Sequence, residues 1–428
     1  MDAESLSAAV EARRDLVLEV LAELVRAARG GHDAVQDHVA DVLRGAGADV
    51  AVVEYRPRDV TVGYEIGAPS TLEGALRYVV GRYGRSEQQV LFWAHSDSEP
   101  VDGSGWTRPL FDAVVDGGRM YGWGIGDDLV GVAMMLAAAR LHHDTGLLDG
   151  RSVAFASVPS KQRAQAIIHA LDNGVGGVGS VYLHPAESGA GLGEIKAIAS
   201  GLLRFHVRVH GRRPDTTEPG HTVFLHTAVD PLPIAARVIE ALRALGEQRA
   251  RSVYYAPVHD VIGRSTNVHV SHVEAGRRER LSQVPTTVDL YGSMTFPPSE
   301  PMADAQAALE QALDAVMRND PWLAERPLEL AWLVGIQGAE TGTDAAVYRA
   351  THDAIVATTG GAPHVNALHA ASDIRNPVLH AGMPTVGIGP LVGDLTVSGG
   401  VDEWADVDDY MRGVEVVLRI ARSFGDAA

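Results

Sequence analysis

The chain contains no cysteine in its 428 residues. This absence excludes disulfides, thiolate nucleophiles and thiolate metal ligands, so any bound metal ion must be held by histidine and carboxylate side chains. No apolar run approaches the ~20 residues that a membrane-spanning helix needs. The N-terminal segment MDAESLSAAVEARRD lacks the basic and then apolar order of a secretory signal. We therefore expect a cytoplasmic protein that does not bind a membrane.

Positive charge is outweighed by negative charge. The chain has 36 lysine and arginine residues against 55 aspartates and glutamates, a formal net charge of −19. This excess disfavours nucleic acid and anionic membrane surfaces as partners. Apolar residues make up 46% of the chain and charged residues 21%, which is typical of a folded globular protein. We expect its partner to be a small-molecule substrate.

Strand and helix patterns alternate along much of the chain. The apolar runs QQVLFWAH, SVAFASV and SVYLHP alternate with helical segments such as DDLVGVAMMLAAARLH. This order predicts an α/β fold with a mostly parallel sheet and helices on both faces. From Gly201 the run LLRFHVRVHG alternates at period two, which indicates a sheet with one exposed face. We predict a catalytic domain over 1–200 and 326–428, including a strand at 328–334, and an inserted α+β domain over 201–325.

Polar side chains follow several of the predicted strands. LFWAHSDSEP ends an apolar run with His95 and Asp97, and YLHPAES ends another with His184, followed by Glu187. The glycine-rich segment YGWGIGDDLVG brings Asp127 to the start of a helix. Because the carboxyl ends of parallel strands meet at one edge of a sheet, two imidazoles and a carboxylate can converge there. Such a set suits a divalent transition metal such as zinc or manganese.

Each of these residues also has a purely structural interpretation. A histidine at a strand end is more often a hydrogen-bonded loop residue than a metal ligand. One of the two neighbouring aspartates, Asp127 or Asp128, is expected to cap the helix that follows them. The Gly-x-Gly-x-Gly turn lacks the spacing of a nucleotide-binding fingerprint. Periodicity alone leaves the structural and the metal-binding interpretations open.

The longer pattern is more specific. HSDSEPVDGSGW followed by PLFDAVVDGGRMYGWGIGDD resembles the aminoacylase, acetylornithine deacetylase and carboxypeptidase-G class of metallopeptidases. VPTTVDLYGSMTFPP, ASDIRN, GMPTVGIGP and VDEW are similar to later segments of that family, so the resemblance covers nearly the whole chain. It implies a zinc-peptidase-like α/β domain with an inserted lid that mediates dimerisation. A homodimer, or a larger homo-oligomer built from dimers, is therefore expected.

The resemblance also implies roles for the residues at the strand ends. His95 and Asp127 would be metal ligands, and His184 falls where the family places a third ligand. Asp97 would orient His95 from the outer shell of the metal site. These roles are carried by the resemblance and not by the spacing alone.

Further residues are implied to act on the substrate. His221, in EPGHTVFLH, is similar to a lid histidine that reaches into the partner subunit's site, with His226 as the alternative. Asp373 and Arg375, in ASDIR, are similar to a loop whose arginine pairs with a substrate carboxylate, for which a bidentate guanidinium is suited.

The sequence departs from the family at two metal-site positions. The family has a Glu-Glu pair, a general base and a ligand, where SVAFASV runs into PSKQRAQ, and no carboxylate stands around Ser160 and Lys161. A metal-binding histidine of the family falls at Gly399, beside Ser398. The ligands that remain predict one divalent ion, manganese or zinc, at each site.

The missing base argues against ordinary peptide hydrolysis, because general-base catalysis is worth ~10²–10⁴-fold. The first hypothesis is a metal-dependent hydrolase of a C–N bond in a small carboxylate-bearing substrate. The specific reaction expected is hydrolytic deamination of an aromatic amine such as 5-nitroanthranilate, by metal-bound hydroxide, to 5-nitrosalicylate and ammonia. His221 or Arg375 would stabilise the negative charge that develops on the nitro group.

Two alternatives remain open. The first is a deacylase of N-acyl amino acids, or a dipeptidase, whose base has moved to Glu187, Asp128 or Glu194. The second is a non-catalytic family member that keeps the fold. The polar groups retained at the strand ends weigh against a purely structural protein.

Overall fold

The computed structural model describes residues 3–67, 70, 72–86, 88–98, 103–185, 188–218, 222–393 and 400–424. The chain forms two compact units. The larger comprises Met1–Val62, Pro69–Ile198 and Glu340–Ala428, and the smaller comprises Gly63–Ala68 and Ala199–Ala339.

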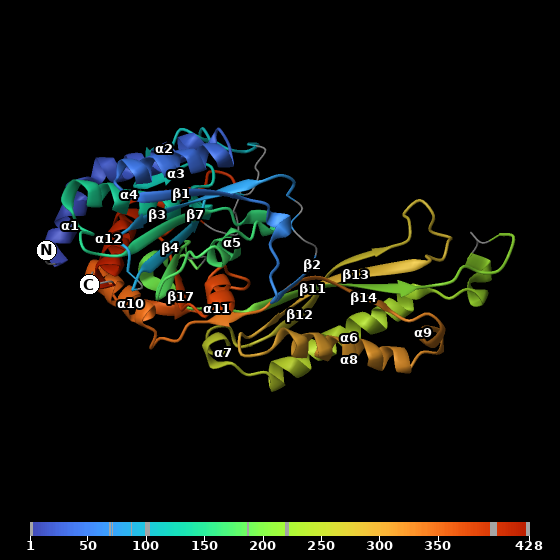
Figure 1. The fold of residues 1–428 in the computed structure, drawn as a ribbon. Coiled ribbons are helices and arrows are strands. Elements are labelled where there is room, and N and C mark those ends of the chain that lie inside the picture. Colours follow the sequence, from blue (N-terminus) through green and yellow to red (C-terminus); the bar gives the residue numbers. More distant parts are fainter. Residues whose placement is uncertain are drawn as a thin grey trace. The chain divides into compact units, whose positions relative to one another are not determined.

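An eight-stranded sheet forms the centre of the larger unit (Figure 1). Its middle strands run parallel to one another, and the predicted mostly parallel sheet is confirmed. Two of them, β4 and β7, are buried along their whole length, as expected for continuous apolar runs covered on both faces. The strand order is β1 (Asp49–Tyr55), β3 (Leu76–Tyr83), β7 (Val153–Val158), β4 (Val90–His95), β8 (Gly179–Leu183), β17 (Thr385–Ile388), β9 (Glu194–Lys196) and β16 (His364–Asn366).

Helices cover both faces of this sheet, as predicted (Figure 1). The connection from β4 to β7 contains α4, and the connection from β7 back across β4 to β8 contains α5. Because the two right-handed crossovers run in opposite directions, their helices lie on opposite faces. The helices of this unit are α1 (Ala3–Glu11), α2 (Arg14–Ala28), α3 (His32–Gly45), α4 (Val130–Thr145), α5 (Ala166–Asp172), α10 (Ala346–Thr359), α11 (Arg375–Ala381) and α12 (Val407–Ser423).

A small three-stranded sheet also belongs to the larger unit. It consists of β18 (Trp404–Asp406), β6 (Arg119–Tyr121) and β5 (Val114–Asp116). The hairpin of β5 and β6 leads directly into the glycine-rich segment before α4. This sheet therefore fixes one end of the segment that carries Asp127.

The first turn of α4 approaches the end of β8 very closely. A Cβ atom built on Gly131 would lie 1.8 Å from the carbonyl oxygen of Leu183. We expect Gly131→Ala to lower the free energy of unfolding by about 2 kcal/mol or more, because the backbone of β8 has to move. Denaturant unfolding measures the change. The control is Gly45→Ala in α3, where an added Cβ meets nothing within 4 Å; an equal loss in both variants would contradict the prediction.

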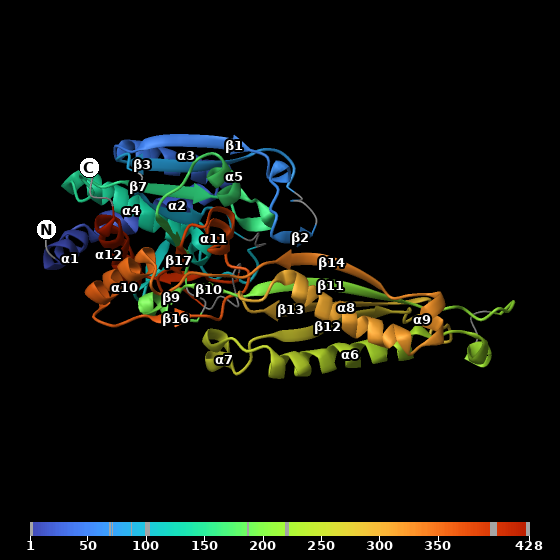
Figure 2. The same ribbon diagram turned by 60° about the horizontal axis from the view of Figure 1, so that its bottom comes forward.

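The smaller unit is a five-stranded antiparallel sheet with helices on one face. Figure 2 shows α6 and α8 side by side along this sheet. Along β11 buried residues alternate with more exposed ones, as the period-two pattern predicted. The strand order is β12 (Asn267–Ala275), β13 (Thr287–Phe296), β11 (Gly201–His210), β14 (Glu329–Ile336) and β2 (Glu65–Gly67), and the helices are α6 (Pro231–Ser252), α7 (Ala256–Ile262), α8 (Met302–Arg318) and α9 (Pro321–Glu325).

One strand assignment from the sequence is wrong. We placed the strand at 328–334 in the larger domain, but β14 pairs with β11 in the smaller unit, which extends to Ala339. Alternation identifies a strand, but it does not identify the strand that pairs with it, because that pairing is a long-range contact. In the part of the chain that the structure describes, no helix combines the length and the apolar character needed to cross a membrane.

Candidate metal centre

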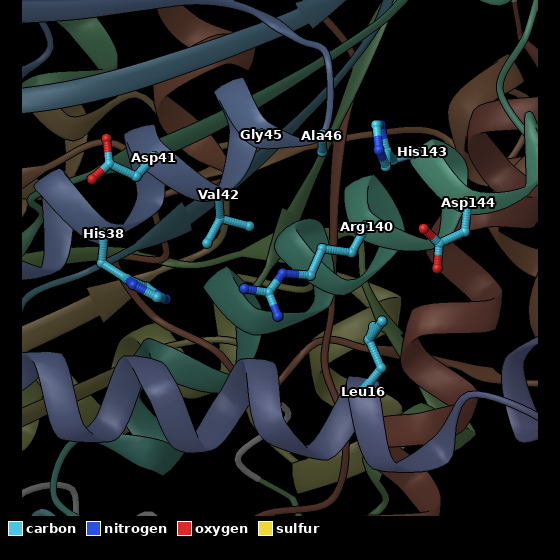
Figure 3. Close-up of a pocket in the computed structure, with 9 residues that line it drawn as sticks. All are labelled: Leu16, His38, Asp41, Val42, Gly45, Ala46, Arg140, His143 and Asp144. Atoms are coloured by element: carbon cyan, nitrogen blue, oxygen red, sulfur yellow. The ribbon is translucent and has the colours of Figure 1, made fainter.

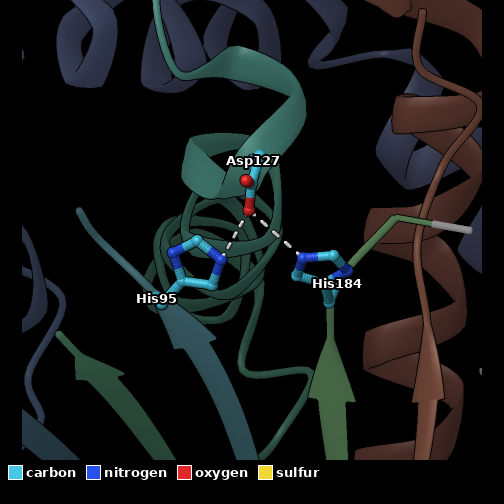
Figure 4. Close-up of side chains that lie close together, drawn as sticks. All are labelled: His95, Asp127 and His184. Carbon is cyan, nitrogen blue, oxygen red and sulfur yellow. Dashed lines mark hydrogen bonds and ion pairs between the residues drawn. The ribbon is translucent and has the colours of Figure 1, made fainter. Parts of the chain in front are cut away.

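Three elements of the larger unit bring His95, Asp127 and His184 together (Figure 4). His95 is the last residue of β4, His184 directly follows β8, and Asp127 lies in the turn Ile125–Leu129 before α4. Asp127 Oδ1 is 2.8 Å from His95 Nε2 and 3.2 Å from His184 Nε2. All three residues are buried, and their potential ligand atoms lie within 4.8 Å of one another. The structure thus joins the three ligands predicted from the sequence.

The outward-facing ring nitrogens suit metal binding by this cluster. His95 Nδ1 lies 2.7 Å from the carbonyl oxygen of Asp97, and His184 Nδ1 lies 3.0 Å from that of Pro185. For His95, an Nδ1–H group that donates to this carbonyl leaves the Nε2 lone pair for a metal ion. His184 Nδ1 also lies 2.9 Å from the ammonium group of Lys196, which can only donate, so this nitrogen accepts a hydrogen bond and the ring proton of His184 lies on Nε2, facing Asp127. Two imidazole nitrogens and one carboxylate oxygen form a set of three protein ligands that fits zinc or manganese.

Opposite charges stabilise the cluster. Burial lowers the pKa of His95, but the charge and hydrogen bond of Asp127, together with Asp97, raise it well above its usual value. Burial raises the pKa of Asp127, but His95 and His184 bring it well below its usual value. Burial and the charge of Lys196 lower the pKa of His184 to about 4. His184 is therefore neutral near pH 7, which is the form that binds a metal ion.

Neither aspartate of the Asp127-Asp128 pair caps α4, so the capping prediction is wrong. The helix begins after Leu129 without a side-chain capping hydrogen bond. Asp128 is buried, and its Oδ2 accepts a hydrogen bond from the backbone N–H of His95 at 3.1 Å. Burial raises the pKa of Asp128 to about 8. The side chain of Asp128 therefore supports the end of β4.

The loop after β7 carries Lys161, to which the sequence analysis assigned no role. Asp97 accepts hydrogen bonds from the backbone N–H groups of Ser160 and Lys161, each at 2.8 Å. The Nζ of Lys161 lies 2.6 Å from Asp127 Oδ2. The Asp97 carboxylate thus positions this loop, while its oxygen Oδ1 lies 3.6 Å from Nδ1 of His95.

A second lysine lies on the other side of the cluster. Lys196 is the last residue of β9 and is almost completely buried. Its Nζ is 2.9 Å from His184 Nδ1 and 3.1 Å from the carbonyl oxygen of Pro185. The ring of Tyr182 stacks on His184 at 5.5 Å between centroids. The sequence analysis assigned no role to Lys196 or Tyr182, although Tyr182 stands two residues before His184 in YLHPAES.

Asp373 and Arg375 interact with each other. Arg375 Nη1 donates a hydrogen bond to Asp373 Oδ1 at 2.9 Å, and the arginine is buried at the start of α11. Asp373 Oδ2 accepts hydrogen bonds from the hydroxyl groups of Ser160 and, at 3.4 Å, Tyr182. The loop is thus connected to the metal cluster through Ser160, and a contact of Arg375 with a substrate carboxylate stays a prediction.

Other predicted residues lie elsewhere. His221 and Glu187 fall outside the described residues, as do Ser398 and Gly399. Glu194 on β9 is buried and accepts hydrogen bonds from Ser188 Oγ at 2.6 Å and Asn366 Nδ2 at 2.8 Å. His226 is exposed in the segment Thr222–Thr227 of the smaller unit.

A cavity of about 540 Å³ lies away from this cluster, among α2, α3 and α4 (Figure 3). It is not lined by any of the predicted site residues. Two of its charged groups are already paired, Arg140 with Glu23 at 2.8 Å and Asp144 with Arg13 at 3.5 Å. The residues that line it are Leu16, His38, Asp41, Val42, Gly45, Ala46, Arg140, His143 and Asp144.

A mostly parallel α/β sheet with a buried histidine and carboxylate cluster at its strand ends is the arrangement of a metal-binding enzyme site. Residues 91–423 match the family model described as peptidase family M20/M25/M40. The chain belongs to this family, which confirms the resemblance inferred from the sequence. It is a hydrolase of amide-type bonds, and a divalent transition metal, zinc or manganese, is its cofactor.

The chain is also similar to individual members of the family. It is 28% identical over 410 residues to a succinyl-diaminopimelate desuccinylase of Methylobacterium radiotolerans, with 91% of each chain covered. A tripeptidase structure from Staphylococcus aureus has a TM-score of 0.69 at 15% identity, covering 96% of this chain and 99% of the other. A dinuclear metal-binding peptidase of Bacillus subtilis has a TM-score of 0.61 at 15% identity, covering 96% and 98%. The two structures support the fold alone.

Proposed function

We propose that the enzyme hydrolyses the amide bond of a small carboxylate-bearing substrate, such as an N-acyl amino acid or a dipeptide. The observation that carries this proposal is the buried cluster of His95, Asp127 and His184 at the carboxyl ends of β4 and β8. The similarity to desuccinylases, whose name describes removal of an acyl group from an amine, supports an amide as the bond that is broken. This reaction is the alternative that the sequence analysis left open.

Each residue of the cluster has a part in the proposed reaction. A divalent ion held by His95, Asp127 and His184 would polarise the substrate carbonyl and lower the pKa of a bound water. The backbone carbonyl of Asp97 orients the imidazole of His95, and the ammonium group of Lys196 orients that of His184. Both Nε2 atoms face Oδ1 of Asp127, where the metal ion would be held.

Three carboxylates are candidates for the general base: Asp128, Glu187 and Glu194. Asp128 is fully buried and bonds the backbone of His95, and Glu194 bonds Ser188 and Asn366. Both are therefore engaged in structural contacts. We retain Glu187, three residues after His184 in the sequence, as the proposed base, with Arg375 and His221 as the proposed contacts to the substrate.

The test is a substrate panel given to the purified protein after loading with manganese or zinc. The panel contains N-succinyl and N-acetyl amino acids, dipeptides and 5-nitroanthranilate, with release of free amine or ammonia as the readout. We expect amine release from an acyl amino acid or dipeptide, its loss on chelation and its return with metal. A His95→Ala variant is the control for contaminating hydrolases. No turnover of any amide by the metal-loaded protein would contradict the proposal.

A second candidate is hydrolytic deamination of an aromatic amine such as 5-nitroanthranilate. The observation that favours it is Lys161, which lies in the segment where the resemblance places the Glu-Glu pair of the peptidases and directs an ammonium group at Asp127. An ammonium group cannot accept a proton. Ammonia release from 5-nitroanthranilate, without hydrolysis of any amide, would establish this candidate in place of the first.

We also propose that the chain forms a homodimer through the smaller unit. The strand β12 lies at one end of the five-stranded sheet, and its residue Val273 is 48% exposed. An unpaired edge strand offers backbone hydrogen bonds to a second chain. Sedimentation velocity is expected to give twice the chain mass of 45.4 kDa. A monomer at micromolar concentration would contradict this prediction.

A further inference from the structure

Lysine is very rare in this chain, and its position is informative. Of the 36 lysine and arginine residues only Lys161 and Lys196 are lysines. Both contact the metal cluster, Lys161 through Asp127 Oδ2 at 2.6 Å and Lys196 through His184 Nδ1 at 2.9 Å. An ammonium group is a compact point charge, whereas guanidinium is broad and planar. A chain that uses arginine everywhere else thus places its two ammonium groups at this one site.

The ammonium group of Lys161 is held in place by its surroundings. The Asp97 carboxylate accepts the backbone N–H groups of Ser160 and Lys161, and the Ser160 hydroxyl bonds Asp373. The loop is therefore fixed from two sides, so that the Lys161 side chain extends from a rigid backbone towards Asp127. The side chain of Lys161 is 23% exposed, whereas that of Asp127 is 6% exposed.

The two oxygens of Asp127 have different partners. Oδ1 lies between His95 Nε2 and His184 Nε2, where one metal ion fits, and Oδ2 bonds Lys161 Nζ. An aspartate that bridges two metal ions gives one oxygen to each ion. Here the second oxygen is already neutralised by a fixed positive charge, and a second divalent ion at Oδ2 would be repelled by it.

We propose that Lys161 takes the place of a second metal ion, so that the centre holds one divalent ion and one fixed ammonium group. The inference rests on the proposed function only for the location of the metal ligands. Unlike a metal ion, the lysine side chain is covalently attached to the chain and cannot leave the site. The positive charge beside Asp127 is therefore independent of metal concentration.

The test measures metal binding without substrate, by equilibrium dialysis of the full chain against manganese or zinc and elemental analysis. We expect one ion per chain in the wild-type protein. In Lys161→Met we expect the first ion to bind about tenfold or more tightly, because a nearby like charge and a competitor for Asp127 have been removed. Lys161→Gln is expected to give the same change, and it serves as the second variant if Lys161→Met does not fold.

The control is Arg151→Met, which removes one positive charge just before the opposite end of β7 and is expected to leave metal affinity unchanged. Two ions per wild-type chain, or folded Lys161 variants that bind the first ion no more tightly, would overturn the inference. A single bound ion that binds more tightly in the Lys161 variants, together with a silent substrate panel, would contradict the proposed function and support the role of Lys161. The two proposals therefore fail in distinguishable ways.

Discussion

Replacing Asp127 by asparagine is expected to lower metal affinity by at least about a hundredfold, more than loss of an outer-shell partner typically costs. The neutral amide cannot supply a charged ligand oxygen between His95 and His184. It also leaves Lys161 without its carboxylate partner. Hydrolysis at limiting metal is expected to fall by the same factor or more. Metal titration by calorimetry, followed by turnover at fixed free metal, measures both effects.

The matched control for this variant is Asp314→Asn on α8 of the smaller unit, an equal change in charge at an exposed helix position. It is expected to leave metal affinity and turnover within twofold of the wild type. If Asp127→Asn binds metal as tightly as the wild-type protein, then the ion is held elsewhere. In that case the cluster of His95, Asp127 and His184 would be a structural ion-pair network.

The second large effect is expected from Lys196→Met, and it depends on pH. Burial and the Lys196 charge lower the pKa of His184 to about 4, so His184 is neutral at pH 5 in the wild-type protein. Without that charge the pKa of His184 rises, and protons compete with the metal for this ligand at pH 5 but not at pH 8. Burial still lowers the pKa of His184 in the variant, so we expect the ratio of metal affinity at pH 8 to that at pH 5 to increase about twofold or more.

The comparison between the two pH values separates this effect from a loss of packing. His95, whose pKa is raised well above its usual value, releases its proton on metal binding in both proteins, so its contribution cancels in the comparison. If Lys196 only filled space, its replacement would change metal affinity by the same factor at both pH values. Parallel affinity curves would therefore contradict the assigned effect of the Lys196 charge.

The site could be predicted from sequence where a residue lies directly at the end of a predicted strand or, as for Asp127, at the start of a predicted helix. His95 and His184 follow apolar runs, and in a parallel sheet the ends of such runs converge. Lys161 and Lys196 do not stand directly after a predicted apolar strand. The chain has only two lysines, and this rarity was a signal that could have pointed to them. Their contacts with Asp127 and His184 join segments 34 and 12 residues apart.

The capping prediction for the two aspartates failed for a related reason. An acidic residue before a helix is a sound local signal for a cap. At Asp127 and Asp128 the local preference is overridden, because β4 and β8 place a histidine and a backbone N–H group within reach of these carboxylates. Buried partners of opposite charge outweigh the modest stabilisation that a cap provides.

The sequence by itself determined the α/β class, the cluster of His95, Asp127 and His184, and the likeness to the metallopeptidase family. The fold class follows from apolar periodicity, and the roles of the three residues follow from the resemblance. Tertiary structure decided that β14 belongs to the smaller sheet, that Asp97 positions the loop of Lys161, and that an ammonium group lies beside Asp127. Strand pairing and side-chain contacts across the sheet join residues far apart in the chain, and no local pattern specifies such partners.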